Sequence, residues 1–267
     1  MDHLDELESK SIYIIREAYH RFKNIAALWS VGKDSTVMLH LIRKSFFGRI
    51  PFPVIYIDTG KHFKEMYEFR DKIAKEWNLN LIISRNKEAD DLGIGPEDKF
   101  KCCNMRKTEA LKKTIKEYGF DALILGIRRD EHGVRAKERY ISPRDEKFQW
   151  NYEDQPPEIW DQYKTKTDEK THMRVHPLLH WTELDVWLYI KREKLPVNPL
   201  YFARKVNGVW KRYRSLGCEP CTTPIESTVK NIDEMIEEIK TSKTAERAGR
   251  SLDKEKIMQR LRALGYM

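Results

Sequence analysis

The chain has 267 residues, of which 40% are hydrophobic and 34% charged, and its formal net charge is +8 at pH 7. This composition is typical of one large globular domain, or one domain with an appendage, and excludes a disordered chain. No apolar stretch is long enough to span a bilayer, and the acidic residues 1–6 lack the apolar core of a signal peptide, so we expect a cytoplasmic protein without membrane contact. Because no nucleic-acid-binding motif and no unbroken basic tract accompany the positive charge, we favour small anionic substrates and expect no nucleic-acid partner.

Short apolar segments alternate with amphipathic helical patterns. A helix is predicted over 8–23, and five strands are predicted at 25–29, 53–57, 79–84, 122–127 and 174–179. Further helices are predicted at 35–47, 63–77, 103–118 and 182–194, and Thr182 with Asp185 forms a capping box at the start of the last one. This alternation predicts an α/β fold with a doubly wound parallel sheet of about five strands and helices on both faces.

Two segments depart from the alternation. Residues 128–173 form a long polar stretch without periodicity, which we expect to be a long active-site loop. Residues 199–267 contain a Cys-x-x-Cys pair, many arginines and a final amphipathic helix. We therefore divide the chain into an α/β domain over 1–198 and an irregular C-terminal segment over 199–267 that folds back over the site.

The segment Ser30-Val31-Gly32-Lys33-Asp34-Ser35 follows the first predicted strand and opens a helix. Such a turn aims backbone N–H groups and a helix N-terminus at one point, which favours an anion. Gly32 lets the backbone approach closely, Lys33 adds a positive charge, and Ser30 and Ser35 supply hydroxyl donors. The chain contains neither a Walker loop nor a Gly-x-Gly-x-x-Gly motif, and an ordinary strand-to-helix turn is the alternative.

Ligands of parallel sheets bind beyond the carboxyl ends of the strands, where several polar or small residues of this chain fall. Asp58 follows the second predicted strand and Gly126 lies at the end of the fourth. An ATP site could use Asp58 near the ribose or the metal, with a helix-cap role as the alternative. His176 lies in the fifth predicted strand, just before a proline, and is as readily a core or turn residue as a ligand.

Basic residues gather after the fourth strand and near the C-terminus. They are Arg128, Arg129, Arg135, Lys137, Arg139, Arg247 and Arg250. A reaction that joins two anions needs such residues, because the reactants repel each other until their charge is offset. A solvated surface of ion pairs is the alternative, since Asp130, Glu131 and Glu138 lie among them.

The chain has four cysteines, the adjacent pair Cys102 and Cys103 and the spaced pair Cys218 and Cys221. In a cytosolic protein such a set indicates a metal site more than disulfides. Adjacent cysteines suit zinc knuckles poorly, whereas four thiolates are the complement of a cubane iron–sulfur cluster. We predict a 4Fe–4S cluster, with zinc, or unligated or redox-active thiols, as alternatives. Either metal would join the C-terminal segment to the loop before the helix at 103–118, beside Lys107.

Taken together, these residues resemble the small, catalytic subunit of bacterial sulfate adenylyltransferase, and the loop resembles that of the ATP pyrophosphatase superfamily. The similar segments span essentially the whole chain, at 30–35, 51–59, 65–71, 128–131, 135–139, 181–187, 214–218 and 245–250. The resemblance implies an adenine nucleotide alpha hydrolase-like fold and the formation of adenylyl sulfate and pyrophosphate from ATP and sulfate, in sulfate assimilation towards cysteine. It also implies a complex with a larger GTPase subunit, which drives the uphill step.

The resemblance implies a role for each candidate residue. ATP would be bound by Ser30, Gly32, Lys33, Asp34, Ser35, Asp58 and Gly126, with Mg²⁺ bridging the triphosphate near Asp34. The catalytic residues would be Lys33, which holds the β- and γ-phosphates, and a set that places sulfate and offsets charge in the transition state: Lys107, Arg128, Arg129, Arg247 and Arg250. Sulfate is already a dianion, so no general base is needed.

The cysteines depart from the subunits of this family and resemble the cluster ligands of adenylyl-sulfate reductases, which share the fold. A reductase is therefore the alternative function. It needs a free nucleophilic cysteine, which the reductases carry in a C-terminal tail, whereas no cysteine follows Cys221 here. The loop also keeps Lys33, Asp34 and Ser35, which a reductase that handles no triphosphate would not require. We favour the transferase, and a thiol-ligated ATP-sensing or scaffold module is a third, non-catalytic possibility.

Overall fold

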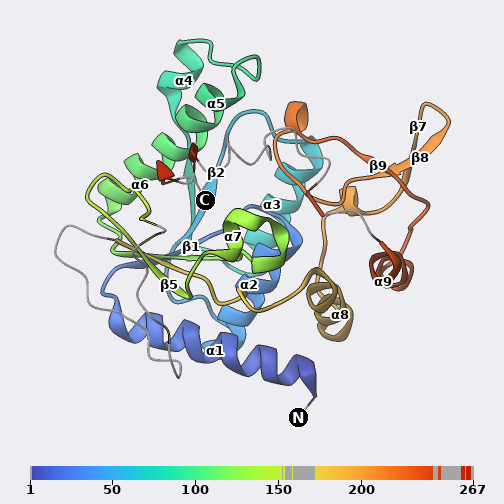
Figure 1. Ribbon diagram of the computed structural model, residues 1–267, viewed down its shortest axis with the longest axis horizontal. Helices are drawn as coiled ribbons and strands as arrows, with labels where there is room; N and C mark the ends of the chain where they lie inside the picture. The colour runs from blue at the N-terminus through green and yellow to red at the C-terminus, as the bar shows by residue number, and fades with distance from the viewer. Residues whose placement is uncertain are drawn as a thin grey trace.

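A six-stranded sheet forms the centre of the computed structural model, which describes residues 2–151, 153, 158, 172–242, 246–247, 260–261 and 263–265 (Figure 1). The strands are β1 (Ile25–Leu28), β2 (Val54–Ile57), β3 (Leu81–Ser84), β4 (Ala122–Leu125), β5 (Ile141–Arg144) and β6 (His172–Val175). Their order is β3-β2-β1-β4-β6-β5, and only the edge strand β5 runs antiparallel to its neighbour. The α/β sandwich with a mostly parallel sheet is confirmed.

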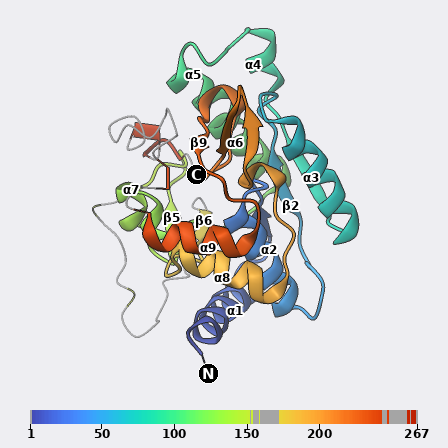
Figure 2. The same cartoon turned by 90° about the vertical axis from the view of Figure 1, so that its right-hand side faces the viewer.

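Helices cover both faces of this sheet. The chain steps outward through α2 (Lys33–Ser45) and α3 (Lys64–Glu76), then returns through α6 (Ala110–Tyr118) to β4 on the other side of β1. Right-handed crossovers therefore place α2 and α3 on one face and α6 on the other. The helices α1 (His3–Arg21) and α8 (Glu183–Glu193) pack against α2 (Figure 2).

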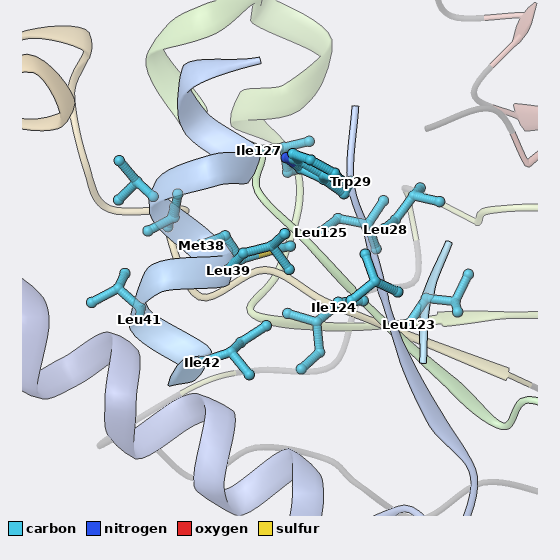
Figure 3. Close-up of a cluster of buried hydrophobic side chains, with 14 of the residues drawn as sticks. Leu28, Trp29, Met38, Leu39, Leu41, Ile42, Leu123, Ile124, Leu125 and Ile127 are labelled. Carbon is cyan, nitrogen blue, oxygen red and sulfur yellow. The ribbon is translucent and has the colours of Figure 1, made fainter. Parts of the chain in front are cut away.

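The core lies between α2 and the first strands of the sheet. Every residue of β1, β2 and β4 is buried, as continuous apolar strands of a covered parallel sheet require. Leu39 and Ile42 of α2 point toward the strand β4, where Ile124 lies beside Ile42 (Figure 3). This packing fixes the N-terminus of α2 against the carboxyl ends of β1 and β4.

The predicted elements form with small shifts at their ends. Thr182 and Asp185 make the expected capping box of α8. The predicted helix over 103–118 is divided into α5 (Lys99–Cys103), a π-helical turn η1 (Asn104–Glu109) and α6. Cys102 and Cys103 thus lie in a short helix and not in a loop, and the irregular turn follows them directly, as is common at functional sites.

The segment 128–173, which we expected to be one long loop, contains regular structure. It includes η2 (Arg129–Glu131), α7 (Gly133–Ala136) and the edge strand β5. Pro143 hides β5 in the sequence, because proline cannot donate to a β-ladder and is tolerated only at edges or bulges. The sheet accordingly has six strands, one more than predicted.

The C-terminal segment also holds more structure than expected. A small antiparallel sheet of β7 (Arg204–Val206), β8 (Val209–Arg212) and β9 (Ile225–Glu226) lies there, with η4 (Pro199–Tyr201), η5 (Glu219–Cys221) and α9 (Ile232–Thr241). The helix α9 packs on α8, and Glu219 N–H donates to Lys61 O at 2.8 Å, which ties the segment to the end of β2. The remaining helix, α4 (Lys87–Asp91), follows β3. The boundary at residue 198 stays a prediction. Within the described residues, no helix has the length and apolarity needed to cross a membrane.

Candidate active site

The loop between β1 and α2 is held by its own hydroxyl groups. Ser35 Oγ donates to Gly32 O at 3.1 Å and lies 3.0 Å from Ser30 Oγ, while Ser30 N–H donates to Ser35 Oγ at 3.2 Å. No side chain caps α2, whose N-cap is Gly32. Val31 has a φ of 65°, which is strained for a β-branched residue and is typical of functional sites. The loop therefore presents the N-terminus of α2 to the carboxyl edge of the sheet.

Gly126 at the end of β4 allows this helix N-terminus to approach the sheet closely. A Cβ at this position would lie 3.0 Å from Asp34 O and 3.0 Å from Ser35 Cα, both of which are backbone atoms. The sequence predicted Gly126 as a nucleotide-binding residue. The structure adds a packing reason for glycine here, because any side chain would displace α2.

Two buried cations meet three carboxylates beside the loop. Lys33 and Arg128 are at most 1% exposed. Lys33 Nζ lies 3.2 Å from Asp34 Oδ2, and the Glu246 carboxylate forms ion pairs with both Lys33 and Arg128. Arg128 also pairs with Asp34, and its Nε donates to Asp130 Oδ1 at 2.9 Å. The cations that the sequence assigned to an anionic substrate are thus paired with the chain's own carboxylates.

A fourth carboxylate, Glu131, belongs to the same group. It pairs with Arg135, and Arg247 Nη1 lies 4.0 Å from its Oε1. Burial raises the pKa of Glu131, but the charges of Arg135 and Arg128 outweigh it and lower this pKa to about 2. Burial likewise raises the pKa of Glu246, and Arg128 and Lys33 hold it well below its usual range. Both side chains are therefore ionised at neutral pH.

Asp34, Glu131 and Glu246 each offer an oxygen, and these oxygens lie within 4.8 Å of one another. Carboxylate oxygens are the ligands that Mg²⁺ prefers, usually together with substrate phosphates. The donor set therefore fits a magnesium ion brought in with a nucleotide.

A cleft opens beside these groups at the carboxyl ends of β1, β2 and β4. Its polar lining comes from the loop, from the turns after β2 and β4, from η1 and α7, and from the C-terminal segment. It comprises Ser30, Lys33, Asp34, Ser35, His62, Lys107, Glu131, Arg135, Tyr201, Ser215, Glu246 and Arg247. The Tyr201 hydroxyl accepts from Lys33 N–H at 2.9 Å, so η4 buttresses the first turn of α2.

The four cysteines line one small cavity next to this cleft. Cys103, Cys218 and Cys221 are buried in a cluster that also contains Trp150 and Leu261. Burial raises the pKa of Cys218, but Lys107, His62 and Thr59 together lower it to about 5, whereas burial raises the pKa of Cys103 to about 11. Lys107 lines both the cysteine cavity and the cleft.

The sulfur spacing bears on the kind of metal. Within the described chain, the one group of three ligand atoms within 4.8 Å of one another is the carboxylate group, so the sulfur atoms form no such group. Tetrahedral zinc with Zn–S bonds of 2.3 Å would place its sulfurs about 3.8 Å apart. A cubane spreads its thiolates more widely, because each binds a different iron.

The structure gathers most of the predicted site residues. Ser30, Gly32, Lys33, Asp34, Ser35, Lys107, Gly126 and Arg247 line the cleft. Arg128 joins them through the pairs with Asp34 and Glu246.

Three predicted or considered residues lie apart from the cleft lining. The Arg129 guanidinium lies over the Tyr140 ring at 5.1 Å. Asp58 Oδ1 accepts from Tyr67 Oη at 2.9 Å and Gly60 N–H at 2.8 Å, and His176 Nδ1 lies 2.7 Å from Arg139 O. Arg250 lies outside the described residues.

Several residues that build the site were not singled out from the sequence. Glu246 lies in the segment 245–250, and the resemblance of this segment to the family was the only indication that Glu246 belongs to the site. Glu131 was considered only as an ion-pair partner on the surface. No local pattern marks Tyr201 or His62, because each reaches the cleft only through the tertiary fold.

The match to family models and solved structures defines the class of protein. Residues 24–224 match the model described as phosphoadenosine phosphosulfate reductase domain. The phosphoadenylyl-sulfate reductase of Candida auris, a phosphate complex, superposes with a TM-score of 0.58 at 22% identity, covering 83% of this chain and 96% of that chain. The FMN adenylyltransferase of Candida glabrata with FMN and AMPCPP gives a TM-score of 0.57 at 18% identity, covering 83% and 64%. At such identities the likeness shows the fold alone, which is adenine nucleotide alpha hydrolase-like.

Sequence relatives specify the family. The sulfate adenylyltransferase subunit 2 of Zymomonas mobilis is 44% identical, over 96% of this chain and 94% of that protein. The protein of the same name from Buchnera aphidicola is 45% identical, over 94% and 92%. The chain belongs to the sulfate adenylyltransferase subunit 2 family.

Proposed function

We propose that this protein is an ATP sulfurylase that transfers AMP from ATP to sulfate, forming adenylyl sulfate and pyrophosphate. The names of its relatives support this reaction. The observation in the structure that carries it is the pair of buried cations beside the loop, Lys33 and Arg128, which hold the carboxylate of Glu246. Such a pair can exchange that carboxylate for a phosphate oxygen of ATP.

Different residues of the cleft would bind the two anionic substrates, ATP and sulfate. The N-terminus of α2 and the hydroxyls of Ser30 and Ser35 would bind the β- and γ-phosphates, with Lys33 and Arg128 offsetting their charge. Lys107, Arg135 and Arg247, on other walls of the cleft, would hold sulfate in line with the α-phosphorus. Asp34, Glu131 and Glu246 would hold Mg²⁺, which supplies further neutralisation of the triphosphate. Arg129, Asp58 and Arg250 remain proposed contributors.

The subunit name of the relatives implies at least one further subunit. We propose that this partner is a larger GTPase, in a heterodimer whose GTP hydrolysis drives the unfavourable formation of adenylyl sulfate. We place the protein in the cytoplasm, in sulfate assimilation towards cysteine.

We propose that Cys102, Cys103, Cys218 and Cys221 bind a 4Fe–4S cluster. Their gathering around one cavity and the lowered pKa of Cys218 support thiolate ligation of a metal, and four thiolates are the complement of a cubane cluster. Bound there, a cluster would join α5 to the C-terminal segment.

The test runs the reaction downhill. Anaerobically purified protein, with and without the GTPase subunit, is mixed with adenylyl sulfate, Mg²⁺ and pyrophosphate, and ATP is measured. We expect ATP formation. The matched domain model and the four cysteines favour a reductase as the second candidate, and AMP and sulfite formed with thioredoxin in the absence of any ATP would establish it instead.

A further inference from the structure

Four polar residues share one face of the β5–β6 ribbon, away from the cleft. In the antiparallel register Ser142 pairs with Arg174 and Arg144 pairs with His172, so the four side chains lie on the same face. All four are buried, with exposures of 0% for Ser142, 2% for Arg144 and Arg174, and 5% for His172. None of them lines the cleft described above.

The hydrogen-bonding capacity of this face is not filled. Arg144 Nη2 donates to Glu138 Oε1 at 2.9 Å and Nη1 to Ser142 Oγ at 2.8 Å, but its Nε has no partner. Arg174 Nη2 reaches only Gly265 O, at 3.5 Å, and Nη1 has no partner. Neither ring nitrogen of His172 has one. A neutral imidazole has one N–H and one acceptor nitrogen, so three of these four nitrogen atoms are donors. Buried donors are normally satisfied, so three unpaired donors on one face point to an absent acceptor.

The charge of this face is also unbalanced. Glu138 pairs with Arg144, whereas within the described chain no carboxylate lies in ion-pair distance of Arg174. A guanidinium does not lose its proton in a protein, and burying it without a counter-charge is unfavourable. A water molecule could accept a hydrogen bond but could not offset the charge.

The face has a cover of its own. The Phe148 ring lies 5.0 Å from the His172 ring, and Arg144 lies 5.3 Å over the Trp150 ring. Trp150 N–H donates to Ala263 O at 3.3 Å, which places the chain near its C-terminus over the same region. Residues 148–150 and 263–265 therefore lie close to this face.

We propose that Arg174, Arg144 and His172 bind a tetrahedral oxyanion, sulfate or phosphate, at a site separate from the ATP cleft. Two guanidinium groups and an imidazole N–H are the donors that such an anion, with its four oxygens, accepts from. The proposal stands independently of the adenylyl-transfer reaction, because it uses none of the residues assigned to that reaction.

Thermal unfolding in increasing sulfate or phosphate, against chloride at matched ionic strength, tests the site. The variant Arg247→Met removes one of the cations that we assign to sulfate in the cleft, and in this background we expect a saturable rise in Tm with sulfate or phosphate. We expect Arg174→Met to abolish the saturable part and leave only the linear effect that sulfate has on any protein. Arg49→Met removes the same charge from an exposed position and should keep the saturable rise.

The outcomes separate the alternatives. The anion that gives half of the saturable rise in Tm at the lower concentration, sulfate or phosphate, is the preferred ligand. An equal saturable rise with chloride would overturn the proposal. So would an unchanged rise in Arg174→Met. If Arg174→Met fails to fold, His172→Phe serves in its place and should raise the midpoint at least tenfold. Crystals grown in selenate should show an anomalous peak beside Arg174, and a peak confined to the cleft would count against the site.

Discussion

The ion pairs of Glu246 with Lys33 and Arg128 can be replaced by ion pairs with a phosphate of the substrate. Each cation is buried, so it would be unfavourable without a counter-ion, and the Glu246 carboxylate fills that role between them. A triphosphate offers the same charge in the same place. The site can therefore be stable without substrate and still bind a highly charged substrate.

Replacing Lys33 should remove catalysis without unfolding the protein. Lys33→Met keeps the length of the side chain, and Glu246 retains its pair with Arg128. We expect kcat/KM for ATP formation from adenylyl sulfate to fall by about 100-fold or more, because a preorganised charge is lost. Circular dichroism and the same assay on Lys64→Met, an exposed lysine of α3, are the controls. Turnover within a few-fold of the parent would show that Lys33 does not act on the phosphates.

Neutralising Glu246 should strengthen the binding of anions in the absence of metal. In Glu246→Gln the amide competes poorly for Lys33 and Arg128, so we expect metal-free pyrophosphate to bind about tenfold more tightly, equivalent to about 1.4 kcal/mol. Isothermal titration calorimetry measures this. Glu226→Gln, at an exposed position of β9, makes the same charge change as a control. Equal affinities of Glu246→Gln and the parent protein would mean that Glu246 does not occupy the phosphate position.

At the scale of elements, the site depends on how closely α2 approaches the sheet. β1 delivers the loop, β4 supports it through Gly126, and Tyr201 of η4 buttresses the first turn from the C-terminal segment. A shift of any of these elements moves several donors at once. Displacing any one of them should therefore lower both activity and stability.

Gly126→Ala tests the close approach of β4 to α2. The new Cβ would meet backbone atoms of Asp34 and Ser35 at 3.0 Å, so α2 must move. We expect a loss of about 1–3 kcal/mol in the free energy of unfolding and a fall of at least about tenfold in kcat/KM. Gly133→Ala, where a Cβ meets nothing within 4 Å, should change neither. Denaturant unfolding and the ATP-forming assay decide, and a fully active Gly126→Ala would refute the packing argument.

The turn after β6 should make stability depend on pH through His176. Burial, only partly opposed by the Arg139 carbonyl, lowers the pKa of His176 to about 3, whereas an unfolded histidine has a pKa of about 6.5. Below pH 6.5 the unfolded state binds more protons, so stability is lost as the pH falls from 6.5 toward 3. This histidine alone should cost about 1.4 kcal/mol at pH 5.5.

Denaturant unfolding at pH 7.5 and 5.5 measures this loss. His176→Gln should lose less stability than the parent protein by about that amount. His20→Gln, an exposed residue of α1, should behave like the parent. Parallel losses in all three proteins would show that His176 is not the titrating group.

For the whole molecule, the cysteine cavity is where distant parts of the chain meet. Cys102 and Cys103 lie in α5, Cys218 and Cys221 lie at η5, and the pairing of His62 with Cys218 brings in the end of β2. A metal centre there would stabilise the molecule as a crosslink does, because it joins segments more than one hundred residues apart.

Anaerobic purification should yield a coloured protein with about four iron atoms per chain. Cys221→Ser should lose the visible absorption and lower the Tm, whereas Thr223→Ser, an exposed position two residues further along, should keep both. Iron analysis, visible spectroscopy and thermal unfolding give the result. One zinc ion per chain and no iron would show that the cysteines bind zinc and not a cluster. A purified protein without metal, whose Tm does not change in Cys221→Ser, would show that the thiols are unligated.

The α/β class, the five predicted strands, the loop at 30–35 and the family could all be inferred from local patterns in the chain. Periodicity and turn chemistry depend on residues that are near neighbours in the sequence, so the sequence records them. The pairing of Glu246 with Lys33 and Arg128, the support of α2 by Tyr201, and the position of Arg129 over Tyr140 are seen only in the folded structure. This structure also revealed β5, since an edge strand with a proline has no apolar pattern and forms only because β6 offers a partner. These contacts join residues far apart in the chain, and burial and charge, rather than spacing, select them.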